Sequence, residues 1–177
     1  TTLGCLPALG WNSWNTFTWD INEALIKDVA DLFVSEGIGT RDGFVDAIQN
    51  GDFGYDFLEN IPENEGRTYR LDGYLFPDTY FVYSDSTETE ILSKLLANFN
   101  RKFDENLRAE AKRRGYTVDE ILCLASVIES EAYYRSDMTS ISSVFHNRLE
   151  NRGFPYLQSD ATGKYAKETE GNKANLT

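Results

Sequence analysis

Residues 117–134 read TVDEILCLASVIESEAYY and predict a helix with a defined start and one buried side. Thr117 and Glu120 have the spacing of a capping box, in which each side chain accepts a hydrogen bond from the other residue's backbone amide. At 100° per residue, several small or apolar side chains fall on one line along this helix. We expect the buried line to consist of Ile121, Ala125, Ile128 and Ala132.

Glu129 lies on the flank of that line, beside Leu122 and Ala125. A carboxylic acid held against apolar side chains has its charged form disfavoured, so its pKa rises and it can donate a proton near neutral pH. A glycosidase acid needs this property. From helix position alone, the simpler interpretation is a boundary residue whose carboxylate reaches water. Glu131 points away, because residues two apart on a helix do not face each other.

Other polar residues near this helix allow both a functional and a structural interpretation. Gln158, Ser159 and Asp160 form a polar run that, on its own, is typical of a surface loop. His146 is the one histidine of the chain, and its helix neighbours favour a packing or surface role. Asn147 would ordinarily belong to a solvated helix face. The sequence has no nucleophilic triad, phosphate-binding loop or metalloprotease motif, and it indicates no metal or cofactor.

The N-terminal third of the chain combines an aromatic segment with short helices. All three tryptophans fall within residues 1–19, without a clear helical or strand period. Capping residues and apolar spacing then predict a helix over 20–37 and a second over 40–51, each ended by a glycine.

Extended structure and longer helices are expected after residue 66. The aromatic segment 69–82 predicts extended structure interrupted by a turn at 76–78. Thr87 and Glu90 form a capping box, and the apolar spacing that follows predicts one helix of roughly seven turns reaching Gly115. Asp137 is expected to cap the last helix, whose inner face would consist of Ile141, Val144, Phe145 and Leu149.

Composition excludes several classes of partner. The net charge is −12 and the 17 basic residues are scattered, which argues against binding nucleic acid or an anionic membrane. Cys5 and Cys123 are far apart and support neither a disulfide framework nor a zinc site. No run of eighteen apolar residues and no basic segment before an apolar stretch is present. We expect a soluble chain of one domain, or one domain with a small companion, whose anchor or export signal would lie outside it.

Several sequence blocks, in the correct order, resemble the endolytic murein transglycosylases of the MltG (YceG-like) family over about residues 29–166. Beside the long helix, these blocks are YDFLENIP (55–62), LDGYLFPDTY (71–80), LASVIESEA (124–132), SVFHNRL (143–149) and LQSD (157–160). Several independent blocks are far more specific than any single motif.

The resemblance implies a set of functional residues and a fold. It implies that Glu129 is catalytic and that the polar side chains of the later blocks bind the substrate, with two tyrosines shaping the groove. The expected substrate-binding residues are Asn147, Gln158, Ser159, Asp160, Tyr74 and Tyr80. The implied fold is α+β. It has an aromatic segment at 1–19, a small LysM-like subdomain at 20–66 and a mostly helical catalytic lobe at 67–177.

The activity implied by the resemblance is cleavage of the β-1,4 bond between N-acetylmuramic acid and N-acetylglucosamine within peptidoglycan glycan strands. The product would carry a 1,6-anhydro-muramoyl end. Because the sugar's own C6 hydroxyl closes the ring, one carboxylate can suffice and no cofactor is needed. The resemblance also implies the outer face of the cytoplasmic membrane, with cell-wall synthases as possible partners.

The chain departs from the family pattern in three ways. The N-terminal membrane helix and first strand of the family are missing, LQSDATGKY lacks the proline that normally follows LQSD, and Thr177 precedes the family's last segment. We therefore expect a C-terminally truncated lobe, and the alternative function is a non-catalytic peptidoglycan-binding or scaffold fragment.

The N-terminal segment resembles a different family. Residues 6–26, LPALGWNSWNTFTWDINEALI, are similar to the start of family 27 α-galactosidases. Those enzymes are eight-stranded barrels, which need roughly 250 residues, and nothing after residue 30 resembles them. We interpret this segment as fused, with α-galactosidase activity the least favoured of the three functions.

Overall fold

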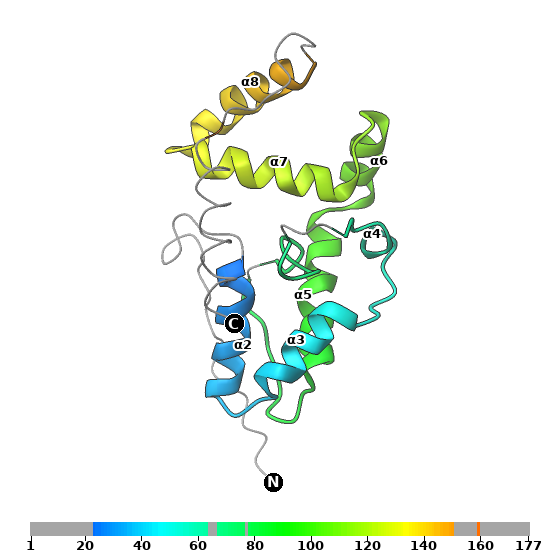
Figure 1. The fold of residues 1–177 in the computed structure, drawn as a ribbon, viewed down its shortest axis with the longest axis vertical. Coiled ribbons are helices and arrows are strands. Elements are labelled where there is room, and N and C mark those ends of the chain that lie inside the picture. Colours follow the sequence, from blue (N-terminus) through cyan, green and yellow to red (C-terminus); the bar gives the residue numbers. More distant parts are fainter. Residues whose placement is uncertain (1–22, 64–66, 77, 151–158, 160–177) are drawn as a thin grey trace. The chain divides into compact units, whose positions relative to one another are not determined.

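The structure is a computed structural model that describes residues 23–63, 67–76, 78–150 and 159. The chain divides into two compact units, Thr1–Asp119 and Glu120–Thr177. Within the described ranges the regular structure is helical, with a single β-bridge at Tyr80 and no strand (Figure 1). The mostly helical character is thus confirmed. The predicted segment 1–19 lies outside the described residues, and the LysM-like subdomain and the domain boundaries stay predictions.

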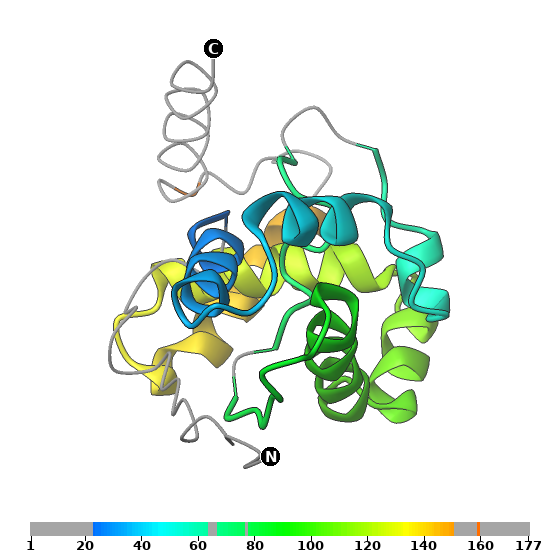
Figure 2. The ribbon, with the colours of Figure 1, turned by 90° about the horizontal axis from the view of Figure 1, so that it is seen from below.

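In the first unit, α3 packs against both α2 and α5 (Figures 1 and 2). The predicted helices at 20–37 and 40–51 are confirmed in their described residues by α2 and α3. The helices of this unit that lie wholly within it are α2 (Glu23–Ser35), α3 (Arg41–Asn50), α4 (Asp56–Glu59), α5 (Glu88–Lys102) and α6 (Glu105–Arg113).

A shared hydrogen-bond cluster joins the start of α3 to the start of α5. Thr40 is the N-cap of α3, and its hydroxyl accepts a hydrogen bond from the Gly43 amide at 3.0 Å. The Thr40 amide donates to Oε1 of Glu88 at 2.9 Å. A Cβ atom on Gly43 would lie 2.3 Å from the same carboxylate oxygen, so glycine permits this close approach. Hydrogen bonds from the backbone amides of Glu88 and Thr40 lower the pKa of Glu88.

The capping box of Thr87 and Glu90 is confirmed, but the single long helix predicted after it is wrong. The Thr87 amide donates to Glu90 Oε2 at 2.8 Å, and the Glu90 amide donates to Thr87 Oγ1 at 3.3 Å. The helix ends at Lys102, and α6 begins two residues after Phe103. Asp104 has extended backbone angles and accepts a hydrogen bond from the Leu107 amide at 2.9 Å. An aspartate that can cap a new helix competes with continuation of the old one.

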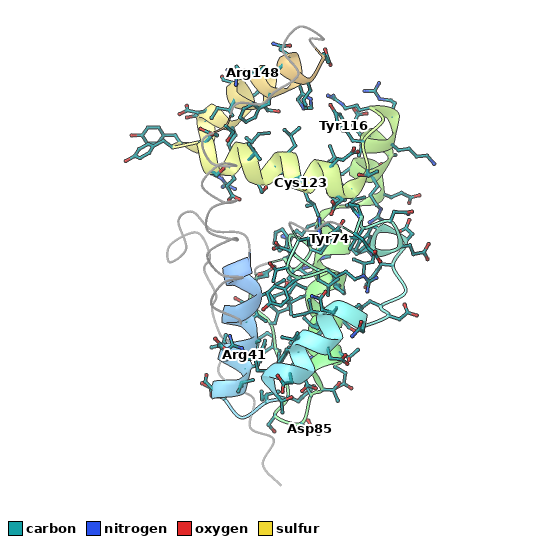
Figure 3. The ribbon with its side chains drawn as sticks, in the orientation of Figure 1. Arg41, Tyr74, Asp85, Tyr116, Cys123 and Arg148 are labelled. Atoms are coloured by element: carbon teal, nitrogen blue, oxygen red, sulfur yellow. The ribbon has the colours of Figure 1, made fainter. Side chains whose placement is uncertain are left out.

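The core of the first unit contains an aromatic cluster of Phe57, Tyr74 and Phe99. The ring centroids lie 5.2 Å apart for Phe57 and Phe99, 5.4 Å for Tyr74 and Phe99, and 6.0 Å for Phe57 and Tyr74. The Tyr74 side chain is fully buried, and Figure 3 shows it among the densely packed side chains of this unit. Centroid distances in this range are typical of favourable aromatic contacts.

The extended structure predicted over 69–82 is wrong for its first half, where residues 70–74 form turns. Side chains satisfy the backbone here in place of a neighbouring strand. The Gln49 amide donates to the Thr68 carbonyl at 2.7 Å and its oxygen accepts from the Arg70 amide at 3.1 Å. The Arg70 guanidinium donates to the Gly51 carbonyl at 2.8 Å. Because these partners already bond the backbone, a strand ladder is not needed.

The predicted helices of the second unit are confirmed in position. The helix α7 (Val118–Glu131) begins directly after Thr117, and its first two residues belong to the first unit. A short 3-10 helix, η1 (Arg135–Asp137), leads into α8 (Met138–Glu150). Cys123 lies exposed on α7 (Figure 3), and Cys5 lies outside the described residues. Among the described residues, none of the helices has the length and hydropathy of a membrane span.

Candidate functional site

Glu129 lies in the last turn of α7 and is half-buried. Burial disfavours its charged form and raises its pKa, and the positive charge of Arg135 partly offsets this effect. Arg135 comes from η1, just after the helix, so both groups belong to the second unit. The carboxyl group therefore keeps its proton to a higher pH than an ordinary glutamate, which is what a proton donor requires.

The buried line of α7 differs slightly from the predicted one. Leu124 and Ala132 are buried, Ile128 is half-buried between them, and Ala125 is exposed. The inclusion of Ala125 in the buried line was therefore wrong. The buried side is centred nearer Leu124, and an apolar stripe about 100° wide does not by itself fix which of its residues is most buried. Glu129 lies at the edge of this stripe.

Ser159 and Glu131 are joined by a hydrogen bond. Oγ of Ser159 donates to Oε1 of Glu131 at the end of α7, across 28 residues of sequence. Ser159 is buried, with 8% of its surface exposed, whereas Glu131 is exposed. Gln158 and Asp160, which were expected to bind substrate beside Ser159, lie outside the described residues.

The residues expected on α8 occupy different environments. Asn147 is exposed and His146 half-buried, and Figure 3 shows the neighbouring Arg148 on the same helix. Of the expected inner face, Phe145 is buried and Ile141 half-buried. Val144 and Leu149 are exposed at 47% and 44%, so their assignment to the inner face was wrong. Phe145 is the buried aromatic side chain of this helix, and partly exposed apolar side chains beside it are common on protein surfaces.

Tyr74 and Asp119 form a buried polar contact within the first unit. The Tyr74 hydroxyl donates to Oδ1 of Asp119 at 3.0 Å, and Nη2 of Arg67 donates to the same oxygen. Arg67 and Asp119 are also an ion pair with side chains 15% and 9% exposed. Tyr74 thus lies in the core in this structure, and any effect on a groove would be exerted through packing.

Tyr80 is half-buried in a polar network with α5. Its hydroxyl donates to the Phe76 carbonyl and accepts a hydrogen bond from the Asn98 side-chain amide at 2.8 Å. Asn98 also donates to Asp78 at 3.0 Å. Burial raises the pKa of Tyr80, and hydrogen bonds from the Thr79 amide and Asn98 lower the pKa of Asp78. This network joins Phe76, Asp78 and Tyr80 to Asn98 of α5.

Two groups relevant to the site were not predicted as partners. The charge of Arg135 acts on Glu129, and Glu131 bonds Ser159. The influence of Arg135 on Glu129 has a weak signal in the sequence, since the arginine follows the glutamate by six residues. The hydrogen bond between Glu131 and Ser159 has no such signal, because a contact between residues 28 positions apart does not show in the periodicity of the sequence. Within the described part of the chain, no three potential ligands among His, Cys, Asp and Glu are grouped as in a metal site.

The chain is similar to named proteins along most of its length. It is 37% identical over 123 residues to an endolytic murein transglycosylase of Streptococcus pneumoniae, covering 67% of this chain and 21% of that protein. A crystal structure of a YceG-like protein from Listeria monocytogenes superposes with a TM-score of 0.56 at 25% identity, covering 71% of this chain and 43% of that one. The chain therefore spans about a fifth of the length of the first relative.

A second, short similarity is to a different family of enzymes. Over 36 residues the chain is 53% identical to an α-galactosidase of Cyamopsis tetragonoloba, which covers 20% of this chain and 9% of that enzyme. The predicted resemblance to α-galactosidases is confirmed, and it remains local. The model of the YceG-like family, by contrast, matches residues 15–177. From this match we conclude that the chain belongs to the YceG-like family.

Proposed function

We propose that this protein is an endolytic murein transglycosylase that cleaves the MurNAc–GlcNAc β-1,4 bond within glycan strands, with Glu129 as its acid and base. The observation that carries the proposal is the half-buried Glu129 carboxyl group with a raised pKa at the end of α7. Family membership and the name of the streptococcal relative supply the substrate class.

The proposed reaction needs only one carboxyl group. Protonated Glu129 donates its proton to the glycosidic oxygen as the C1–O bond breaks, and the oxygen leaves as the hydroxyl of N-acetylglucosamine. The carboxylate then accepts the proton of the muramoyl C6 hydroxyl, whose oxygen bonds to C1 and forms the 1,6-anhydro ring. The enzyme regains its proton, and no water is consumed. The intramolecular nucleophile replaces the second carboxylate of ordinary glycosidases.

The remaining candidate residues take supporting roles in this proposal. Asn147, Gln158 and Asp160 would orient the sugar through hydrogen bonds and stabilise charge that develops at C1. Ser159 would contribute through its position beside them. Tyr74 and Tyr80 are assigned to the glycan site by the family resemblance. Within the first unit, one is buried in the core and the other is held by Asn98.

The test compares the products that the chain and its Glu129→Gln variant release from purified peptidoglycan. We expect the chain to release anhydro-muropeptides, identified by mass spectrometry. The rate of their release should fall about 100-fold or more in the variant, because general acid catalysis typically contributes at least this factor. Glu120→Gln, an exposed glutamate in the first turn of the same helix, is the matched control and should retain activity. Equal product from the chain and Glu129→Gln would remove Glu129 from the mechanism.

A specific observation also favours the alternative of a non-catalytic glycan-binding fragment. Tyr133 and Tyr134, directly after α7, are 74% and 63% exposed and pack edge to face with centroids 4.6 Å apart. Exposed rings with a polar hydroxyl are suited to contact ligands that present both apolar and polar groups. Binding to sacculi that survives Glu129→Gln, without anhydro products from either protein, would favour this alternative.

The proposal extends to organisation and location. Residues 20–66 would form the LysM-like part, and the protein would act in the cell envelope, at the outer face of the cytoplasmic membrane. Cell-wall synthases would be its partners there. These assignments are supported by family membership alone.

A further inference from the structure

The hydrogen bond between Ser159 and Glu131 connects two blocks that the proposed reaction uses. Ser159 is the centre of the polar run 158–160, and Glu131 stands two residues after the proposed acid on α7. The Ser159 side chain is buried, so its hydroxyl has little access to water. A buried hydroxyl needs a protein partner, and the Glu131 carboxylate supplies one.

Glu131 is placed to reach this partner because of the helix period. It follows the buried Leu124 by seven residues, about two turns, and therefore lies on nearly the same side of α7. Glu129 lies about 160° further round the helix from Glu131, at the edge of the buried stripe. The two carboxyl groups thus lie in different surroundings, and Glu131 directs an oxygen at Ser159.

We propose that Glu131 is a positioning residue: its carboxylate fixes Ser159 at the end of the helix that carries Glu129. This inference rests on the proposed function and gives Glu131 a role without proton transfer. The carboxylate acts as a hydrogen-bond acceptor only, and an amide oxygen can replace it. Loss of the acceptor removes this hydrogen bond and weakens the hold of α7 on Ser159.

Three variants distinguish whether Glu131 acts as a hydrogen-bond acceptor or as a proton donor. Glu131→Gln keeps an acceptor oxygen, Glu131→Ala removes it, and Ser159→Ala removes the donor. We expect Glu131→Ala and Ser159→Ala each to raise KM for glycan strands about tenfold while kcat changes less than about threefold. Glu131→Gln should behave nearly as the unchanged chain. The double variant Glu131→Ala/Ser159→Ala should be no worse than either single variant, because all three lose the same bond.

A second measurement keeps the inference testable if the chain proves inactive on glycans. Hydrogen exchange of the Ser159 amide, followed by NMR, should become faster in Glu131→Ala and remain slow in Glu131→Gln and in Glu120→Gln, an exposed control on the same helix. Unchanged exchange in Glu131→Ala would overturn the positioning role whatever the activity. A kcat loss in Glu131→Gln as large as in Glu129→Gln would also overturn it, since Glu131 would then act through its proton. Absence of turnover with the expected exchange pattern would contradict the proposed function and leave the positioning contact intact.

Discussion

The hydroxyl of Tyr74 donates a hydrogen bond of 3.0 Å to Oδ1 of Asp119, and so joins the 71–80 block to the first turn of α7. Asp119 also forms the ion pair with Arg67, and all three side chains are largely shielded from water. The negative charge lies at a helix N-terminus, where the helix dipole favours it.

Removing Asp119 should be strongly destabilising. Asp119→Ala leaves the Arg67 guanidinium without its carboxylate, and breaking one side of a buried ion pair costs about 3–5 kcal/mol. Tyr74→Phe removes one hydrogen bond to the charged carboxylate and should cost about 1.5–3 kcal/mol. Urea denaturation followed by circular dichroism gives both free energies of unfolding. A cost for Asp119→Ala no greater than that of Tyr74→Phe would mean that the ion pair contributes little.

The break between α5 and α6 predicts a separate cost for its cap. Asp104→Ala removes the acceptor of the Leu107 amide and should lower the free energy of unfolding by about 1 kcal/mol. Asp85→Ala, in an exposed loop of the same unit, is the control and should change it by less than about 0.5 kcal/mol. If the two variants are equally stable, Asp104 does not act as a cap in solution.

The raised pKa of Glu129 predicts a pH dependence of stability. The folded state holds this proton more tightly than the unfolded state, so the stabilisation is complete below the ordinary glutamate pKa and is lost as the pH rises through the folded value. Glu129→Gln removes this dependence. The unfolding free energy of the variant relative to the unchanged chain should therefore increase between about pH 4 and pH 7. A difference that stays constant or decreases over this range would contradict the burial of the acid.

Sequence patterns predicted the helices well because periodicity and caps are local. The Thr87 and Glu90 capping box appears as expected, and α7 begins after Thr117. The break at Asp104 was missed because Phe103 and Leu107 continue the apolar spacing across it. The turns at 70–74 were not predicted, because the aromatic content of 69–82 favours extended structure. The sequence gives no sign that Gln49 and Arg70 bond the backbone of this region.

The candidate site was only partly predictable. The position of Glu129 at the edge of an apolar stripe follows from helix geometry, and the structure gives its carboxyl group a raised pKa. The partner of Ser159 could not be inferred, because Glu131 faces it only after the chain has turned through η1 and α8. Tyr74 was expected near the substrate, yet its ring is buried among Phe57 and Phe99. A sequence motif can identify candidate functional residues, but the contacts between their side chains depend on how the chain packs.

The partly buried Glu129 carboxyl group on α7 retains its proton to a higher pH than an ordinary glutamate, and the positive charge of Arg135 opposes this. The most direct measurement is a ¹³C NMR titration of the Glu129 carboxyl carbon in the chain and in Arg135→Gln. The midpoint should lie above about 4.3, the reference value for glutamate, and should rise further when the positive charge is removed. A midpoint at or below the reference value, with no response to Arg135→Gln, would contradict the account.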